Sequence, residues 1–123
     1  MKFLKCALCK DTIIAKENNL FSCCNKEMEE VKPNTAEAAT EKHIPVINTK
    51  NNKVIITVGE TLHPMTEEHY IEWIYVVTNT REIKYNLKPN AKPEVELTLE
   101  KNEIIKEVYA YCNLHSLWLN ELK

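Results

Sequence analysis

The sequence has only one glycine, Gly59, among its 123 residues. Glycine adopts positive φ angles more readily than any other residue, so a chain with tight turns needs a replacement at those positions. Asparagine enters the left-handed region at low cost, and it occurs throughout the segments that we expect to be loops. The sequence therefore predicts that asparagines occupy some of the positive-φ positions.

Long apolar runs and clusters of basic residues are also missing. No apolar segment approaches the roughly 20 residues of a membrane-spanning helix, and the start of the chain turns polar too soon for a secretory signal. The formal net charge is −2, with 16 Lys and Arg against 18 Asp and Glu, which argues against the basic stripe of a nucleic-acid-binding protein. We expect a cytoplasmic protein that binds neither membrane nor nucleic acid.

Apolar residues make up 44% of the chain, an ordinary share for a folded protein, but they are unevenly distributed. Residues 1–34 are rich in cysteine and too poor in apolar residues for an independent core, so a metal is expected to stabilise this domain. Small and polar residues from 32 to 40 are typical of a linker. We place the domain boundary between residues 34 and 35, with a larger domain over 35–123.

The larger domain is predicted to be made of β-strands. Short runs with β-branched or alternating apolar residues cover Lys53–Val58, Tyr70–Thr78, Glu94–Glu100 and Ile104–Cys112. Alternation predicts that Ile71, Trp73, Tyr75 and Val77 share one face of their strand, and that Val95, Leu97 and Leu99 point inward. Without helix-period segments, the chain is predicted to be all-β, with an antiparallel sandwich as its larger domain.

Four of the five cysteines lie near the N-terminus and are predicted to bind one metal ion. Cys6 and Cys9 form a C-x2-C pair, and Cys23 and Cys24 are adjacent. Four thiolates suit tetrahedral iron or zinc. Disulfides and unmodified thiols are the alternatives, and reduced cytosolic thiols and the adjacency of Cys23 and Cys24 disfavour disulfides.

The remaining cysteine and all four histidines form a second candidate set. Cys112 and His115 are in a C-x2-H arrangement, and His63 and His69 flank a loop that begins with His63-Pro64. One histidine by itself is more often a surface or core residue than a ligand. Here, however, every histidine and cysteine falls into one of two sets, which favours a second metal site at His43, His63, His69, Cys112 and His115.

Several motifs resemble the desulfoferrodoxin family of superoxide reductases. The N-terminal cysteines resemble a desulforedoxin-like domain, although Lys10 and Asn25 replace its usual glycines. In the larger domain, three segments resemble motifs of the family. Residues 41–46 resemble E-K-H-x-P-x, residues 59–73 resemble G-x-x-x-H-P-M-x-x-x-H-x-I-x-W, and residues 109–118 resemble Y-x-Y-C-N-x-H-G-x-W. Ser116 stands where the last motif usually has glycine.

The resemblance implies an immunoglobulin-like sandwich that holds a catalytic iron. By this likeness His43, His63, His69 and His115 are equatorial ligands, Cys112 is axial, and the sixth position receives superoxide. Glu41 matches a carboxylate that occupies this position in the oxidised enzyme, and Lys42 a cation beside it. Iron or zinc would fill the four-cysteine site, rubredoxin would donate electrons, and the protein would be a homodimer.

Two other functions remain open at the level of the sequence. A non-catalytic electron-transfer or metal-binding protein would use the four-cysteine iron as its working centre. A superoxide dismutase would evolve dioxygen as well as peroxide, so measuring oxygen would distinguish it from a reductase. Zinc does not change redox state, so superoxide reduction requires a redox-active metal in the histidine-rich site.

Overall fold

The computed structural model of the protein describes residues 1–16, 20–35, 43–59 and 62–122. Every regular element in these residues is a β-strand, so the predicted all-β fold is confirmed. No helix long and apolar enough to span a membrane was found in the described part. The chain divides into two compact units, Met1–Lys32 and Pro33–Lys123, and each is described by itself.

Unit 1 is a small domain built from two antiparallel sheets. Strand β1 (Lys2–Lys5) lies between β2 (Thr12–Ala15) and β5 (Glu29–Val31), and β3 (Ser22–Cys23) pairs with β4 (Lys26–Glu27). Among the described residues of unit 1, the cluster of buried residues contains Leu4, Cys6, Ala15 and Met28. A core of this size supplies little stabilisation for a folded domain, so further cross-linking is needed.

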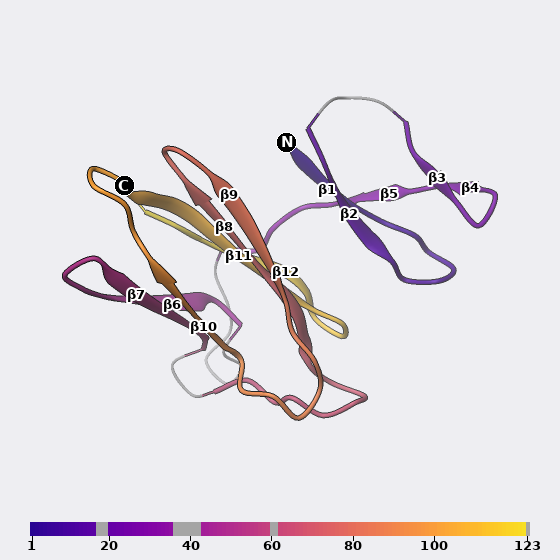
Figure 1. Cartoon of the computed structure of the whole chain (residues 1–123). Helices are drawn as coiled ribbons and strands as arrows, with labels where there is room; N and C mark the ends of the chain where they lie inside the picture. The colour runs from indigo at the N-terminus through magenta and orange to yellow at the C-terminus, as the bar shows by residue number, and fades with distance from the viewer. Residues whose placement is uncertain (17–19, 36–42, 60–61, 123) are drawn as a thin grey trace. The chain divides into compact units, whose positions relative to one another are not determined.

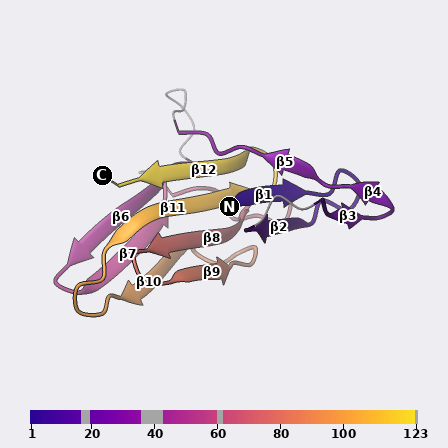
Figure 2. The same cartoon turned by 90° about the horizontal axis from the view of Figure 1, so that it is seen from above.

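Unit 2 is a sandwich of two antiparallel sheets (Figures 1 and 2). The first sheet has the order β10-β7-β6, and the second has the order β12-β11-β8-β9. The strands are β6 (Pro45–Lys50), β7 (Lys53–Val58), β8 (Ile71–Thr78), β9 (Glu82–Asn86), β10 (Glu94–Thr98), β11 (Ile105–Cys112) and β12 (Ser116–Glu121).

The core of unit 2 lies between these sheets because alternate residues of their strands point inward. In β7, Val54, Ile56 and Val58 are completely buried, while in β10 the inward Val95 and Leu97 alternate with glutamates as predicted. The second sheet contributes residues of β8 and β11. The complete cluster is Val54, Ile56, Val58, Ile71, Ile74, Val76, Val95, Leu97, Val108, Ala110 and Cys112.

In strand β8, the side chains do not all lie on the face of the sheet that the sequence predicted. Trp73 and Tyr75 do lie together, since their rings contact those of Tyr111 and Tyr109 in β11. Ile71, however, belongs to the core cluster with Ile74 and Val76, so its predicted position on the Trp73 face was wrong. A register shift between Tyr111 and Cys112, opposite this part of β8, accounts for the change.

Four of the eight positive φ angles in the described residues occur at asparagines, in line with the shortage of glycine. Asn51, Asn90 and Asn102 have φ angles of 60°, 69° and 66° in turns of unit 2. Gly59 has a φ of 83° just after β7, and Ser116 has a φ of 71° at the start of β12. Backbone turns are thus formed without the glycine content that is usual at such positions.

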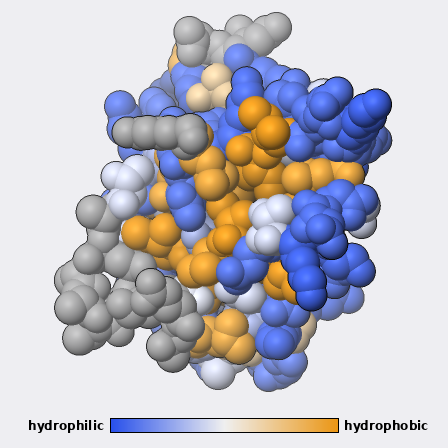
Figure 3. Space-filling model, turned by 90° about the vertical axis from the view of Figure 1, so that its left-hand side faces the viewer, coloured by the Kyte–Doolittle hydropathy of each residue, from blue (hydrophilic) through white to orange (hydrophobic). Residues whose placement is uncertain are grey.

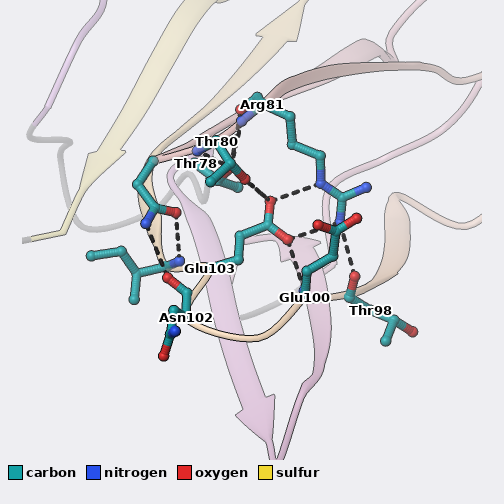
Figure 4. A network of polar contacts seen from close by, with 9 residues as sticks. Thr78, Thr80, Arg81, Thr98, Glu100, Asn102 and Glu103 are labelled. Atoms are coloured by element: carbon teal, nitrogen blue, oxygen red, sulfur yellow. Dashed lines mark hydrogen bonds and ion pairs between the residues drawn. The ribbon is translucent and has the colours of Figure 1, made fainter.

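A buried carboxylate joins the β8–β9 hairpin to the connection between β10 and β11 (Figure 4). Glu103 accepts hydrogen bonds from Thr78 Oγ1 at 2.7 Å, Arg81 Nε at 2.7 Å and the Glu100 backbone N–H at 2.9 Å. Its side chain is only 1% exposed. These donors lower the pKa of Glu103 to about 2, chiefly through Arg81, so the carboxylate stays ionised.

Apolar side chains reach the surface as well as the core. Figure 3 shows one face on which hydrophobic residues gather in the middle, with hydrophilic residues around them. Among the described residues, Leu20, Leu8 and Leu114 are exposed by 81%, 61% and 60%. Folded proteins commonly expose some apolar side chains, so exposure alone identifies no binding surface.

Candidate metal centres

The histidine-rich set of unit 2 comes together at one end of the sandwich. His43 lies just before β6, His63 follows β7, and His69 lies just before β8. Cys112 ends β11, and His115 lies in the turn to β12. Antiparallel pairing aligns Pro45 with Val58 and Cys112 with both Ile71 and Ser116, so segments distant in sequence meet there.

The four imidazoles form a closed ring. Neighbouring ring centroids are 4.7 Å apart for His43 and His63, 4.7 Å for His63 and His69, 5.0 Å for His69 and His115, and 4.8 Å for His43 and His115. One potential ligand atom from each histidine and from Cys112 lies within 4.8 Å of all the others. Five donors can therefore converge on one atom.

The spacing of these donors fits a first-row transition metal. His43 Nε2 and His115 Nδ1 are 3.1 Å apart, and two nitrogens bonded at a right angle about 2.1 Å from a metal are separated by about 3.0 Å. Cys112 Sγ lies 3.9 Å from His115 Nδ1, so the thiol is close enough to share the ion. Imidazole and thiolate donors suit iron, zinc and copper alike.

His63 is already in the form that binds a metal. Its Nδ1 lies 2.7 Å from the Pro64 carbonyl oxygen, a contact that fixes the tautomer when Nδ1 carries the proton. Its Nε2 is buried and has no hydrogen-bond partner among the described residues. Burial lowers the pKa of His63 to about 4, so the imidazole is neutral at pH 7 and offers a lone pair to an ion.

Trp118, the last residue of the motif over residues 109–118, orients part of the same site. Its indole ring stacks on His43, with centroids 4.8 Å apart and planes 14° apart. The indole Nε1–H donates to the His115 carbonyl oxygen at 2.8 Å. Trp118 therefore contacts two of the five candidate ligand residues, and its position three residues after His115 was the available sequence indication.

Two predicted site residues, Glu41 and Lys42, lie outside the described residues. Both precede His43 directly in the sequence. Their roles stay predictions.

The four cysteines of unit 1 form a second cluster. Their sulfur atoms all lie within 4.8 Å of one another, with 3.5 Å between Cys9 and Cys23 and 3.8 Å between Cys23 and Cys24. Sulfurs bonded tetrahedrally about 2.3 Å from a metal are about 3.8 Å apart. None of the five cysteines of the chain, all of which are described, forms a disulfide.

Backbone geometry in this cluster favours the thiolate form of Cys6. The Cys9 backbone N–H donates to Cys6 Sγ at 3.5 Å, and hydrogen bonds from the Cys9 and Leu8 backbone lower the pKa of the Cys6 thiol to about 6. The neighbouring Cys9 thiol has the opposite effect on Cys23, whose pKa rises to about 12. Four thiolates this close need a cation to balance their charge.

Lys10 and Asn25 take the positive φ angles that glycines would otherwise adopt beside the cysteine pairs. Their φ angles are 71° and 60°, and Cys24 has a φ of 54°. The Lys10 ammonium donates to the Ala7 carbonyl oxygen at 2.8 Å, which offsets part of the backbone cost. The departures from the usual glycines thus leave the cysteine turns intact.

The chain is all-β and carries two groups of metal-binding side chains: four imidazoles arranged in a ring beside one thiol, and a separate group of four thiols. These features define the class of cysteine- and histidine-ligated metalloproteins. Comparison with known proteins identifies the family within this class. The desulfoferrodoxin family model matches residues 35–121, and the chain belongs to the desulfoferrodoxin family.

Individual relatives agree over nearly the whole chain. Desulfoferrodoxin from Syntrophotalea carbinolica is 37% identical, covering 98% of this chain and 96% of the relative. A desulfoferrodoxin homolog from Archaeoglobus fulgidus is 36% identical, covering 96% and 94%. The crystal structure of the superoxide reductase from Treponema pallidum matches with a TM-score of 0.83 and 28% identity, covering 98% of this chain and 97% of that one.

Proposed function

We propose that the protein is a superoxide reductase, which converts superoxide, one electron and two protons to hydrogen peroxide. The observation that carries this proposal is the closed ring of His43, His63, His69 and His115 with Cys112 beside it. Family membership and likeness to a solved superoxide reductase support it. In this proposal the four imidazoles and the Cys112 thiolate would hold a non-haem iron.

Iron held by these residues would provide the one-electron chemistry for the reduction of superoxide. The protein tunes that chemistry through Cys112, which is completely buried and donates electron density as a thiolate. Neutral imidazoles add no charge, so the site with ferrous iron and one thiolate carries a single net positive charge, which attracts an anion. Burial of His63 supports this neutral form.

Glu41 and Lys42 complete the proposed site by resemblance. Lys42 would place a cation beside the open coordination position and attract superoxide. The chain has a net charge of −2, so a local cation, and not the overall charge, must provide this attraction. Glu41 would supply the carboxylate that occupies the position after oxidation.

The remaining parts of the proposal concern partners and location. Iron or zinc would fill the four-cysteine site, and a small donor such as rubredoxin would return the electron. A homodimer and a cytoplasmic location are proposed from the family resemblance and from the composition of the chain.

The decisive experiment is to add superoxide to the iron-loaded, reduced protein and to measure peroxide and oxygen together. A reductase forms one peroxide for each superoxide, oxidises its iron and evolves no oxygen. A dismutase evolves one oxygen for each peroxide, and an electron-transfer protein leaves the superoxide to decay at its spontaneous rate. Either of these last two results contradicts the proposal.

The role of Lys42 is tested by Lys42→Ala. We expect superoxide capture to slow by about tenfold at low salt, because the local cation is lost, while the absorption spectrum of the iron stays unchanged. Lys50→Ala is the matched control, since Lys50 is exposed at the opposite end of β6 from His43. Pulse radiolysis measures both rates, and equal rates for the two variants would refute the role of Lys42.

A further inference from the structure

Asn113 links the two parts of the chain that carry His69 and the Cys112–His115 turn. Its side-chain Oδ1 accepts a hydrogen bond from the Tyr70 backbone N–H at 3.0 Å, and its Nδ2 donates to the Glu68 carbonyl oxygen at 2.9 Å. Its own backbone N–H donates to the Tyr70 carbonyl oxygen at 3.2 Å. Three hydrogen bonds thus join segments more than forty residues apart.

These bonds hold the backbone on both sides of His69. The Glu68 carbonyl precedes this histidine and the Tyr70 amide follows it, so the asparagine fixes His69 relative to Cys112 and His115. The regular ladder between β8 and β11 is interrupted here by the register shift between Tyr111 and Cys112. The Asn113 side chain therefore supplies the alignment that strand pairing alone does not.

The same arrangement occurs a second time, at Asn79. Its Oδ1 accepts from the Ile104 backbone N–H at 2.9 Å, its Nδ2 donates to the Asn102 carbonyl oxygen at 3.0 Å, and its N–H donates to the Ile104 carbonyl oxygen at 3.1 Å. The residue held between these bonds is Glu103, whose carboxylate is aimed into the polar network of Figure 4. In both places an asparagine fixes the backbone around one inward-pointing polar side chain.

We propose that Asn113 is a positioning residue that sets the placement of the His69 imidazole in the metal ring. Asn113 does this through backbone hydrogen bonds and is not itself a ligand. The role in superoxide reduction rests on the proposed function, whereas the role in metal binding rests on the geometry of the ring. Mutation of a residue that orients a metal ligand through hydrogen bonds typically weakens metal binding by ten- to a hundredfold.

Full-length Asn113→Ala and Asn79→Ala provide a matched pair. Each variant removes one side-chain hydrogen bond accepted from a backbone N–H and one donated to a backbone carbonyl. Urea unfolding of the metal-free variants measures the structural cost of each change. Competition with a chelator then gives the affinity of the histidine-rich site for iron, and electron paramagnetic resonance of the ferric protein reports its ligand geometry. Asn113→Asp keeps the acceptor for the Tyr70 N–H and replaces the donor to the Glu68 carbonyl with a second acceptor oxygen.

We expect Asn113→Ala to bind iron about tenfold more weakly and to change the ferric spectrum. Asn79→Ala should keep the wild-type affinity within about twofold, whatever stability it loses. Unchanged affinity in the Asn113 variants, or an equal loss in Asn79→Ala, would overturn the positioning role. A wild-type protein that binds iron but does not reduce superoxide would instead contradict the proposed function alone.

Discussion

Ser116 carries an unfavourable backbone conformation next to the candidate metal ligands. Its φ of 71° lies in the left-handed region, where a residue with a Cβ pays about 1–2 kcal/mol. Replacing it with glycine removes this cost and adds a smaller cost from the flexibility of the unfolded chain. We expect Ser116→Gly to raise the free energy of unfolding by about 0.5–1 kcal/mol.

Urea unfolding of the metal-free protein measures this change. Ser116→Ala is the control, because alanine keeps a Cβ and should leave the free energy of unfolding near the wild-type value. If glycine and alanine have the same effect at this position, backbone strain is not the cause.

The backbone conformation of single residues was predictable where it depends on the residue type alone. Glycine is scarce in this chain, and asparagine enters the left-handed region at a lower free-energy cost than most other residues. Positive φ angles accordingly occur at Asn25, Asn51, Asn90 and Asn102. The sequence showed Lys10 where the resembling family usually has glycine, but it could not show that the Lys10 ammonium would donate to the Ala7 carbonyl oxygen. That contact depends on the folded turn.

At the scale of elements, the polar network around Glu103 makes the joint between the β8–β9 hairpin and the β10–β11 connection sensitive to acid. The pKa of Glu103 falls from 4.5 to about 2 on folding, first because of Arg81. A carboxyl with a lowered folded pKa stabilises the protein fully above its unfolded pKa. This contribution is therefore complete above about pH 4.5 and is lost as the pH falls toward 2.

We expect Glu103→Gln to lower the melting temperature at pH 6 by roughly 5–10 °C, because the glutamine cannot accept all the bonds that the carboxylate accepts. The difference from wild type should shrink at pH 3. Metal-free protein is used, so that loss of metal at low pH does not contribute, and the titration of His63 in this range is common to the variant and the wild type. Glu96→Gln is the control, since Glu96 is half exposed beside Lys53, and a constant difference for Glu103→Gln across this pH range would contradict the linkage.

The strands were predictable to different degrees because their burial patterns differ. Strand β7 matches its predicted bounds, and β10 and β11 differ by at most two residues at an end. Strands β6 and β9 were not located individually, since β6 ends in exposed polar residues and β9 has no fully buried residue. Strand β8 is apolar on both faces, so alternation could not show where a register shift would turn Ile71 into the core.

For the molecule as a whole, the metal-binding groups were predictable because histidine and cysteine are rare and fall into two complete sets. The sequence motifs brought together His43, His63, His69, Cys112 and His115, and the structure gathers the same residues. The residues that align them could not be predicted, because Asn113 and Trp118 act through contacts with distant segments. Such contacts exist only once the sandwich has formed.

The unequal cores of the two units lead to a prediction about metal removal. Unit 1 buries four residues in its cluster, too few to offset the conformational entropy of folding, whereas the unit 2 cluster joins both sheets of the sandwich. We expect amide hydrogens of Lys2–Val31 to exchange rapidly in the metal-free protein, while those of β7, β8 and β11 stay protected. Hydrogen–deuterium exchange with mass spectrometry measures both units in one sample.

Adding zinc to the metal-free protein should restore protection in unit 1, because metal binding to the four thiolates supplies the missing folding free energy. Cys9→Ser removes one of these ligands and should prevent the recovery, whereas Cys112→Ser leaves all four in place and should permit it. Protection of unit 1 that survives both metal removal and Cys9→Ser would show that its strands fold without the ion. Because each substitution affects only one of the two metal sites, the exchange pattern assigns the stabilisation of unit 1 to the four-cysteine site.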